Sequence, residues 1–175
     1  ITIDAAIDLT GGTGGVSSTG TDFTTAPTGT ITTDTGAIDI QNTGAILIGQ
    51  ALTTNGGDII IDGGGAAVTS ITVNAATSTG AGAAGIVDLD AKTIDINAGG
   101  SIEAGSGAVT IDSTVGGVTI DDSVDGGSVA VNSAAAISLA DADVTSDAGA
   151  ITLNAAATLT SDGNSALAAT GGKVD

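Results

Sequence analysis

The sequence predicts an all-β protein that folds as a parallel β-helix, or β-solenoid, with three short strands in each turn of about 20–24 residues. Three observations predict this fold. A short unit that begins with glycine recurs along the chain. Aliphatic and other residues alternate within each unit, which is typical of a strand with one buried face. Aromatic residues, which fill most globular cores, make up only 1% of the chain.

The recurring unit is Gly-x-Φ-x-Φ followed by Asp or Asn, where Φ is an aliphatic residue. Between the units lie stretches rich in Gly, Asn and Asp, which are typical of turns. The units, the first of which ends in Gln, are Gly36–Gln41, Gly57–Asp62, Gly85–Asp90, Gly107–Asp112, Gly127–Asn132 and Gly149–Asn154.

Three series of aliphatic residues recur in a constant order, which predicts three parallel sheets around a narrow lumen. The first series starts the units and consists of Ile38, Ile59, Val87, Val109, Val129, Ile151 and Val174. The second series consists of Ile46, Ile71, Ile94, Val118, Ile137 and Leu159. The third is weaker, with Leu52, Ile102, Val124, Val144 and Leu167. No third-series member is identified between Ile71 and Val87.

Residues 36–175 are expected to form regular turns, and residues 1–35 to be irregular or loop-bearing. In the first region, Gly63–Gly65 and Gly80–Gly85 are interpreted as loops. In the second, Gly11–Thr30 is either coil with irregular turns or a larger loop. No window has a sustained helical period. The turn length and the variable corners favour a right-handed solenoid over the left-handed form, which repeats a strict hexapeptide.

The chain is expected to be one solenoid segment, residues 1–175, without an internal domain boundary. Solenoid ends need caps, because they expose an unpaired strand edge and an apolar column. Both ends of this sequence fall in mid-pattern. The segment is therefore predicted to belong to a longer chain or to stack end to end in a filament.

The net charge of −18, from 20 acidic and two basic residues, excludes several functions. Nucleic-acid binding needs a cationic face, and an anionic membrane repels acidic proteins. No apolar run approaches the ~18 residues of a membrane span. The chain has no Cys and no His, so disulfides, Ser–His–Asp catalysis and Cys/His zinc sites are excluded. We expect neither nucleic-acid binding nor membrane insertion, and no cofactor other than possible calcium.

Two columns of corner residues are predicted to be structural. The glycines that open the units need either a positive φ or a close backbone approach; they are Gly36, Gly57, Gly85, Gly107, Gly127 and Gly149. The polar residues that close the units can form turns or side-chain ladders; they are Asp62, Asp90, Asp112, Asn132 and Asn154. An Asp stacked on an Asp is repelled unless it is protonated or bridged by a cation.

Calcium is the metal that this acidic sequence would suit. Asp121, Asp122 and Asp125 form the densest acidic cluster and are its candidate ligands. However, calcium takes six to eight oxygen ligands, and the glycine-rich nonapeptide of calcium-binding β-rolls is absent. Solvated turn residues are the favoured interpretation of this cluster.

Catalysis and ice binding are both less favoured than a structural role. Asp88/Asp90 and Asp141/Asp143 have the spacing of inverting glycosidase carboxylates on a strand. The chain lacks the aromatic or basic lining of a sugar site. A hydroxyl stripe at Thr72, Thr119, Ser138 and Thr160 would suit ice, but Asp95 interrupts it. The chain is therefore expected not to be an enzyme.

The repeats at Gly36–Gly63 and Gly107–Asn132 resemble those of filamentous-haemagglutinin-type proteins and autotransporter passenger regions. The resemblance covers residues 36–175 and rests on repeat style. It implies a right-handed β-helix exported from Gram-negative bacteria as part of a long adhesin. The expected function is thus the shaft of an extracellular, cell-surface adhesin or fibre that contacts a host or neighbouring cell. A self-assembling filament, sheath or S-layer-like subunit is the alternative.

Overall fold

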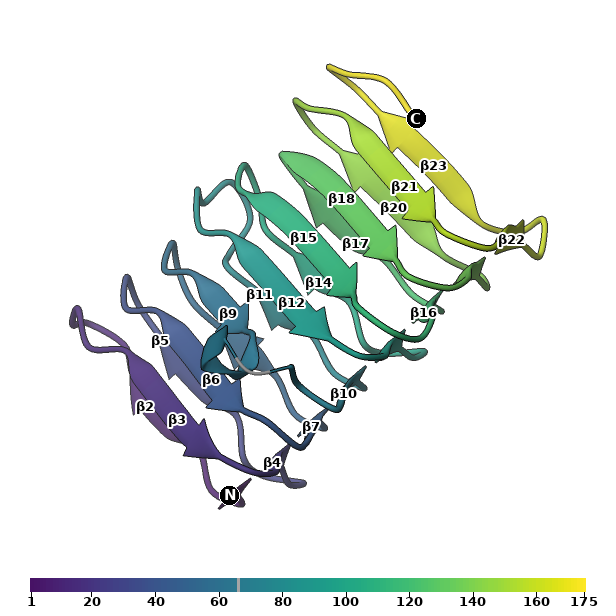
Figure 1. The fold of residues 1–175 in the computed structure, drawn as a ribbon. Helices are drawn as coiled ribbons and strands as arrows, with labels where there is room; N and C mark the ends of the chain where they lie inside the picture. Colours follow the sequence, from purple (N-terminus) through teal and green to yellow (C-terminus); the bar gives the residue numbers. More distant parts are fainter. Residues whose placement is uncertain (66) are drawn as a thin grey trace.

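The computed structural model, which describes residues 1–65 and 67–175, is a β-solenoid of about eight turns (Figure 1). Every strand pairs in parallel with the equivalent strand of the next turn, so consecutive strands of the chain lie in different sheets. The all-β fold class with three strands per turn is confirmed. The only helical segment among the described residues is the short 3-10 turn η1, Gly63–Gly65.

The three sheets run along the solenoid as three walls. Sheet A contains β1 (Thr2–Ile3), β4 (Phe23–Thr25), β7 (Ala45–Ile48), β10 (Ser70–Val73), β13 (Ile94–Ile96), β16 (Val118–Ile120), β19 (Ile137–Leu139) and β22 (Leu159–Ser161). Sheet B contains β2 (Ile7–Leu9), β5 (Ile31–Thr33), β8 (Leu52–Thr53), β11 (Thr77–Ser78), β14 (Ile102–Glu103), β17 (Val124–Gly126), β20 (Asp143–Ser146) and β23 (Ala166–Ala169). Sheet C contains β3 (Val16–Gly20), β6 (Ile38–Asn42), β9 (Ile59–Ile61), β12 (Val87–Ala91), β15 (Ala108–Ser113), β18 (Ser128–Ser133) and β21 (Ile151–Ala155).

Strand register confirms that the three aliphatic series are the inner columns of the three sheets. In sheet C, Val87 pairs with Ile59 on one side and with Val109 on the other. The second series lines sheet A and the third lines sheet B in the same way. The third-series position left open between Ile71 and Val87 is occupied by Thr77, which pairs with Leu52 and Ile102.

Residues 1–35 contain five strands, β1 to β5, that pair in register with the following turns. The Gly/Thr-rich stretch from 11 to 30 therefore forms part of the solenoid wall rather than a larger loop. Val16 pairs with Ile38, and Phe23 pairs with Ile46. Phe23, the one aromatic residue, is fully buried and occupies the place of an aliphatic residue in the inner column of sheet A.

The lumen holds one continuous core of aliphatic side chains, nearly all of them fully buried. Alternation explains this burial. In three-residue strands such as Ile94–Ile96, the first and third residues face inward and the middle one faces outward. The loops expected at Gly63–Gly65 and Gly80–Gly85 do lie outside the strands, as η1 and as the connection from β11 to β12. None of the described helices is long and apolar enough to cross a membrane.

Candidate functional site

The corner glycines stack into one column because the backbones of successive turns almost touch there. A Cβ atom at Gly57 would lie 2.3 Å from the carbonyl oxygen of Gly36, and one at Gly85 would lie 2.4 Å from that of Gly57. None of these glycines has a φ in the left-handed region. Direct backbone bonds join the column, as where the N–H of Gly127 donates to the oxygen of Gly107 at 2.6 Å. Close approach, rather than a positive φ, therefore requires glycine here.

Buried hydroxyl groups hold the same corner from inside the lumen. Thr54 Oγ1 donates to the carbonyl oxygen of Gly57, and Ser146 Oγ donates to that of Gly149 at 3.0 Å. Thr33 and Thr79 bond Gly36 and Gly85 in the same way. Ser133 forms an equivalent bond, to Ala136, at the corner after sheet C. Sequence inspection missed this column, although a Ser or Thr shortly before a corner glycine is a usable signal.

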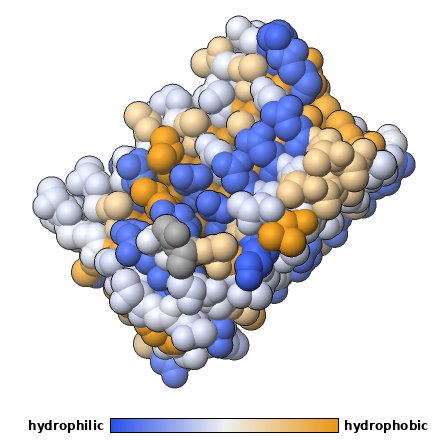
Figure 2. All heavy atoms as spheres, in the orientation of Figure 1, coloured by the Kyte–Doolittle hydropathy of each residue, from blue (hydrophilic) through white to orange (hydrophobic). Residues whose placement is uncertain are grey.

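The polar residues that close the units form a second column on the outer face of sheet C. Asp90, Asp112, Asn132 and Asn154 are consecutive partners in register. Asp62 directly follows β9 and adjoins Asp90, because the preceding residues Ile61 and Leu89 are partners. Figure 2 shows hydrophilic residues running over the face that sheet C occupies in Figure 1.

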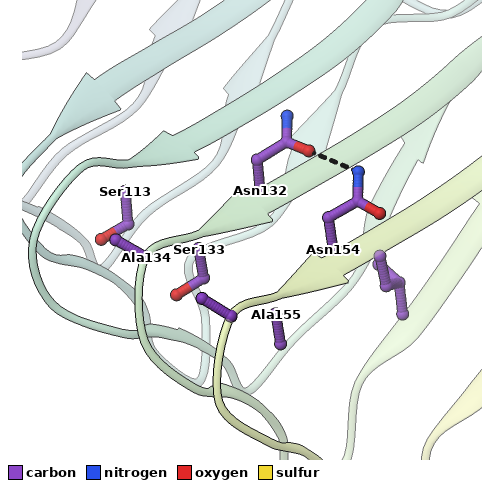
Figure 3. A pocket seen from close by; sticks show the side chains of 8 residues that line it. Ser113, Asn132, Ser133, Ala134, Asn154 and Ala155 are labelled. Carbon is purple, nitrogen blue, oxygen red and sulfur yellow. Dashed lines mark hydrogen bonds between the residues drawn. The ribbon is translucent and has the colours of Figure 1, made fainter.

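The column has two chemically different halves. Toward the C-terminus, Asn154 Nδ2 donates to Asn132 Oδ1 at 2.8 Å (Figure 3). Asn132 Nδ2 in turn donates to Asp112 Oδ1 at 2.6 Å. Toward the N-terminus, the column consists of carboxylates. Burial raises the pKa of Asp90, and the negative charges of Asp112 and Asp62 raise it further.

Asp88 lies two residues earlier on β12, on the same outer face. Burial raises the pKa of Asp88, and the charges of Asp112, Asp62 and Asp90 add to this effect. Asp88 and Asp90 thus share the outer face of one strand, as expected for the first carboxylate pair. The second pair differs, because Asp141 precedes β20 in a turn with φ 52° and does not share a strand with Asp143.

The three candidate calcium ligands do not converge on one point: Asp122 and Asp125 accept hydrogen bonds from different groups. Asp122 accepts the N–H of Ser123 at 2.7 Å and the N–H of Gly99, one turn earlier, at 2.6 Å. These bonds lower the pKa of Asp122. Asp125 accepts the hydroxyl of Thr145 at 2.5 Å on sheet B, and Asp121 follows β16. Within residues 1–65 and 67–175, no three Asp or Glu side chains are grouped as a metal site.

The hydroxyl stripe lies on the outer face of sheet A as one column in register. Asp95 stands between Thr72 and Thr119, and the column continues through Ser138 to Thr160. Toward the N-terminus, Leu47 is the partner of Thr72. An aliphatic and a charged residue therefore interrupt the hydroxyls.

An open, shallow pocket lies at the end of sheet C near the C-terminus (Figure 3). Its lining has amides, hydroxyls and apolar groups but no ionisable side chain, and consists of Ser113, Asn132, Ser133, Ala134, Leu153, Asn154, Ala155 and Ala156. The shifted carboxyls Asp88 and Asp90 are not part of it. The pocket therefore places no acid–base pair around a substrate.

Comparison with known proteins identifies no relative of this chain. No protein family model, no curated protein and no solved structure matches this chain.

Proposed function

We propose that this chain is a non-catalytic shaft segment of an extracellular adhesin or surface fibre. The observation that carries the proposal is the continuous pairing of each turn with the next around a lumen filled by aliphatic side chains. Such a wall resists bending, since each turn bonds to its neighbours through all three sheets. A filled lumen leaves the outer faces as the surfaces that can meet another molecule.

Dimensions and charge support this role. Eight parallel strands at a spacing of about 4.8 Å extend about 34 Å along the axis, so added turns lengthen the molecule without changing its cross-section. The charge of −18 keeps such an elongated surface soluble. The repeats resemble those of filamentous-haemagglutinin-type adhesins in style. On this proposal, the partner is the surface of a host or neighbouring cell.

The proposal is tested by cryo-electron tomography of the cells that produce the protein. An epitope inserted after Gly82 would mark this segment, because Gly82 lies in an exposed connection with open space around it. Untagged cells provide the labelling control. Labelled density that continues through many turns of one chain and ends at the cell envelope would support the shaft.

Two outcomes would overturn the shaft proposal. Separate copies joined end to end by strand pairing would identify a filament subunit instead. Label confined to the cell interior would exclude an extracellular fibre of either kind.

A further inference from the structure

The outer column of sheet C contains a hydrogen-bond ladder with a direction. Each amide donates to the turn before it, from Asn154 to Asn132 and from Asn132 to Asp112. Stacked amides can continue such a ladder indefinitely, because each has both a donor and an acceptor. The ladder ends at Asp112, because an ionised carboxylate has no hydrogen to donate.

The next residue of the column lacks the bond that the ladder would have supplied. Asp90 is the register partner of Asp112 on the adjacent strand. Its Oδ1 atom is buried and has no hydrogen-bond partner within the described part of the chain. A buried oxygen without a partner is unfavourable, and more so when it carries charge. One hydrogen between these two carboxyls would extend the ladder by one step.

Every charged group that faces Asp90 from the neighbouring strands is also acidic. Asp88 shares β12, Asp112 lies on β15, and Asp62 follows β9. Asp39 lies one strand further away, on β6, and its Oδ1 is likewise buried without a hydrogen-bond partner among the described residues. The nearest base in sequence, Lys92, is exposed. Among residues 1–65 and 67–175, the ion pair of Lys173 with Asp175 is the only one formed. Protonation is therefore the simplest way to reduce this repulsion.

We propose that Asp90 takes up one proton from solvent in mild acid and donates it to the carboxylate of Asp112 as a carboxyl–carboxylate hydrogen bond, which makes the solenoid an acid-strengthened structure. The step binds one proton and removes one negative charge, and no covalent bond other than O–H forms. The shared hydrogen bonds the free oxygen of Asp90 and links β12 to β15. This device goes beyond the shaft function and does not depend on it.

The expected pH dependence follows from linkage. Because the folded pKa of Asp90 lies above its unfolded value of about 3.9, the folded state binds more protons than the unfolded state between these two values. Stability from this column therefore rises as the pH falls from neutral toward about 3.9. Asp8, Asp122 and Asp162 have lowered pKa values and act oppositely, so variants must separate the two effects.

The test compares Asp90→Asn with Asp95→Asn in the whole chain. Asp95 also faces outward in the middle of a strand, but its register partners Thr72 and Thr119 are uncharged. Thermal unfolding is followed by circular dichroism at pH 7 and pH 4.5, with EDTA and constant ionic strength. At pH 7, we expect Asp90→Asn to raise the unfolding temperature by about 2–4 °C, and this gain to shrink at pH 4.5. Asp95→Asn should neither raise the unfolding temperature at pH 7 by this amount nor show an effect that shrinks at pH 4.5.

An Asp90→Asn protein that is no more stable than wild type at pH 7 and keeps the full acid response would overturn the proposal. If that variant does not fold, Asp112→Asn is the second test. Its amide can donate to Asp90 while its oxygen still accepts from Asn132. In the wild-type chain, carbon-13 NMR titration of the aspartate carboxyls gives a direct readout. Titration of Asp90 at or below about 3.9 would also overturn the proposal.

Discussion

At the residue scale, the spacing of the turns depends on small groups at the corners. Glycine allows the backbones of consecutive turns to meet, and a buried hydroxyl satisfies the carbonyl oxygen of that glycine. Thr54 and Gly57 are one such pair. Thr77, by contrast, faces the lumen with a buried hydroxyl that has no partner within the described residues. Replacement by valine is therefore expected to change the stability of the fold in opposite directions at these two threonines.

Gly57→Ala should destabilise the fold by about 1–3 kcal/mol, the usual cost of overpacking. The added Cβ would meet the Gly36 oxygen at 2.3 Å, and backbone cannot move aside as a flexible side chain can. Gly12→Ala is the control, since its Cβ would have only ordinary contacts at 3.9 Å. Urea unfolding measures both variants. An equal stability of the two would contradict the close-approach explanation.

Thr54→Val should cost about 1–3 kcal/mol, because it leaves the buried oxygen of Gly57 without the Thr54 bond. Thr77→Val should instead stabilise the fold by about 1 kcal/mol, because it replaces an unpartnered buried hydroxyl with a methyl group of similar size. Chemical unfolding of both variants provides the measurement. A loss of stability in Thr77→Val would show that its hydroxyl has a partner in solution, such as water.

At the scale of the strand and the corner, bonds between turns link elements that are distant in sequence. Asp122, after β16, accepts the backbone N–H of Gly99, which lies after β13. The same side chain accepts the N–H of Ser123 in its own corner. One carboxylate thus joins two consecutive corners between sheets A and B.

Asp122→Ala should lower stability by about 1 kcal/mol at pH 7, because two backbone N–H groups lose their acceptor. The pKa of Asp122 is lowered, so its contribution is present above the unfolded value of about 3.9 and is lost as the pH falls through the folded value. The difference in stability between the variant and the wild type should therefore disappear in acid.

Thermal unfolding between pH 7 and pH 2.5 checks this expectation. Asp121→Ala is the neighbouring control, because the carboxylate of Asp121 accepts no hydrogen bond in the described part of the chain. If both variants lost the same stability, the bonds to Gly99 and Ser123 would not be the cause.

At the scale of the whole molecule, the solenoid is a stack of interchangeable turns. Gly107 and Gly127 open consecutive units, and Val109 pairs with Val129 two residues later. Removal of residues 107–126 would therefore place β18 directly on β12, with Val87 beside Val129 and Asp90 beside Asn132. The cut follows the repeat and preserves the order of the three sheets.

This one-turn deletion should fold with the same strand content per residue and a length shorter by about 4.8 Å. Deletion of 107–117 is the control, since it would put a sheet A strand in a sheet C position and bury the wrong corner residues. Circular dichroism and small-angle X-ray scattering measure the two variants. Cooperative folding of the half-turn deletion would contradict the assignment of three distinct walls.

Much of this fold could be predicted from the chain alone. Period-two alternation identified the inner residues of most strands, and the constant order of the three series assigned them to sheets. Residues 1–35 were harder to interpret, because their strands at Val16 and Phe23 carry Ser18 and Thr25 at inward positions where the next turn has Ile40 and Ile48. The right-handed sense of the solenoid coil stays a prediction.

The sequence by itself determined the fold class, the three inner columns and the stacking of corner residues, because alternation and repeat order are local properties of the chain. Only the tertiary structure decided that close backbone approach, and not a positive φ, requires glycine at the corners. It also placed Thr77 in the third column and left a buried oxygen of Asp90 without a partner beside Asp112. These facts depend on contacts between turns some 20 to 28 residues apart. The geometry of the corners decides how closely one turn packs on the next, and no local sequence pattern specifies that packing.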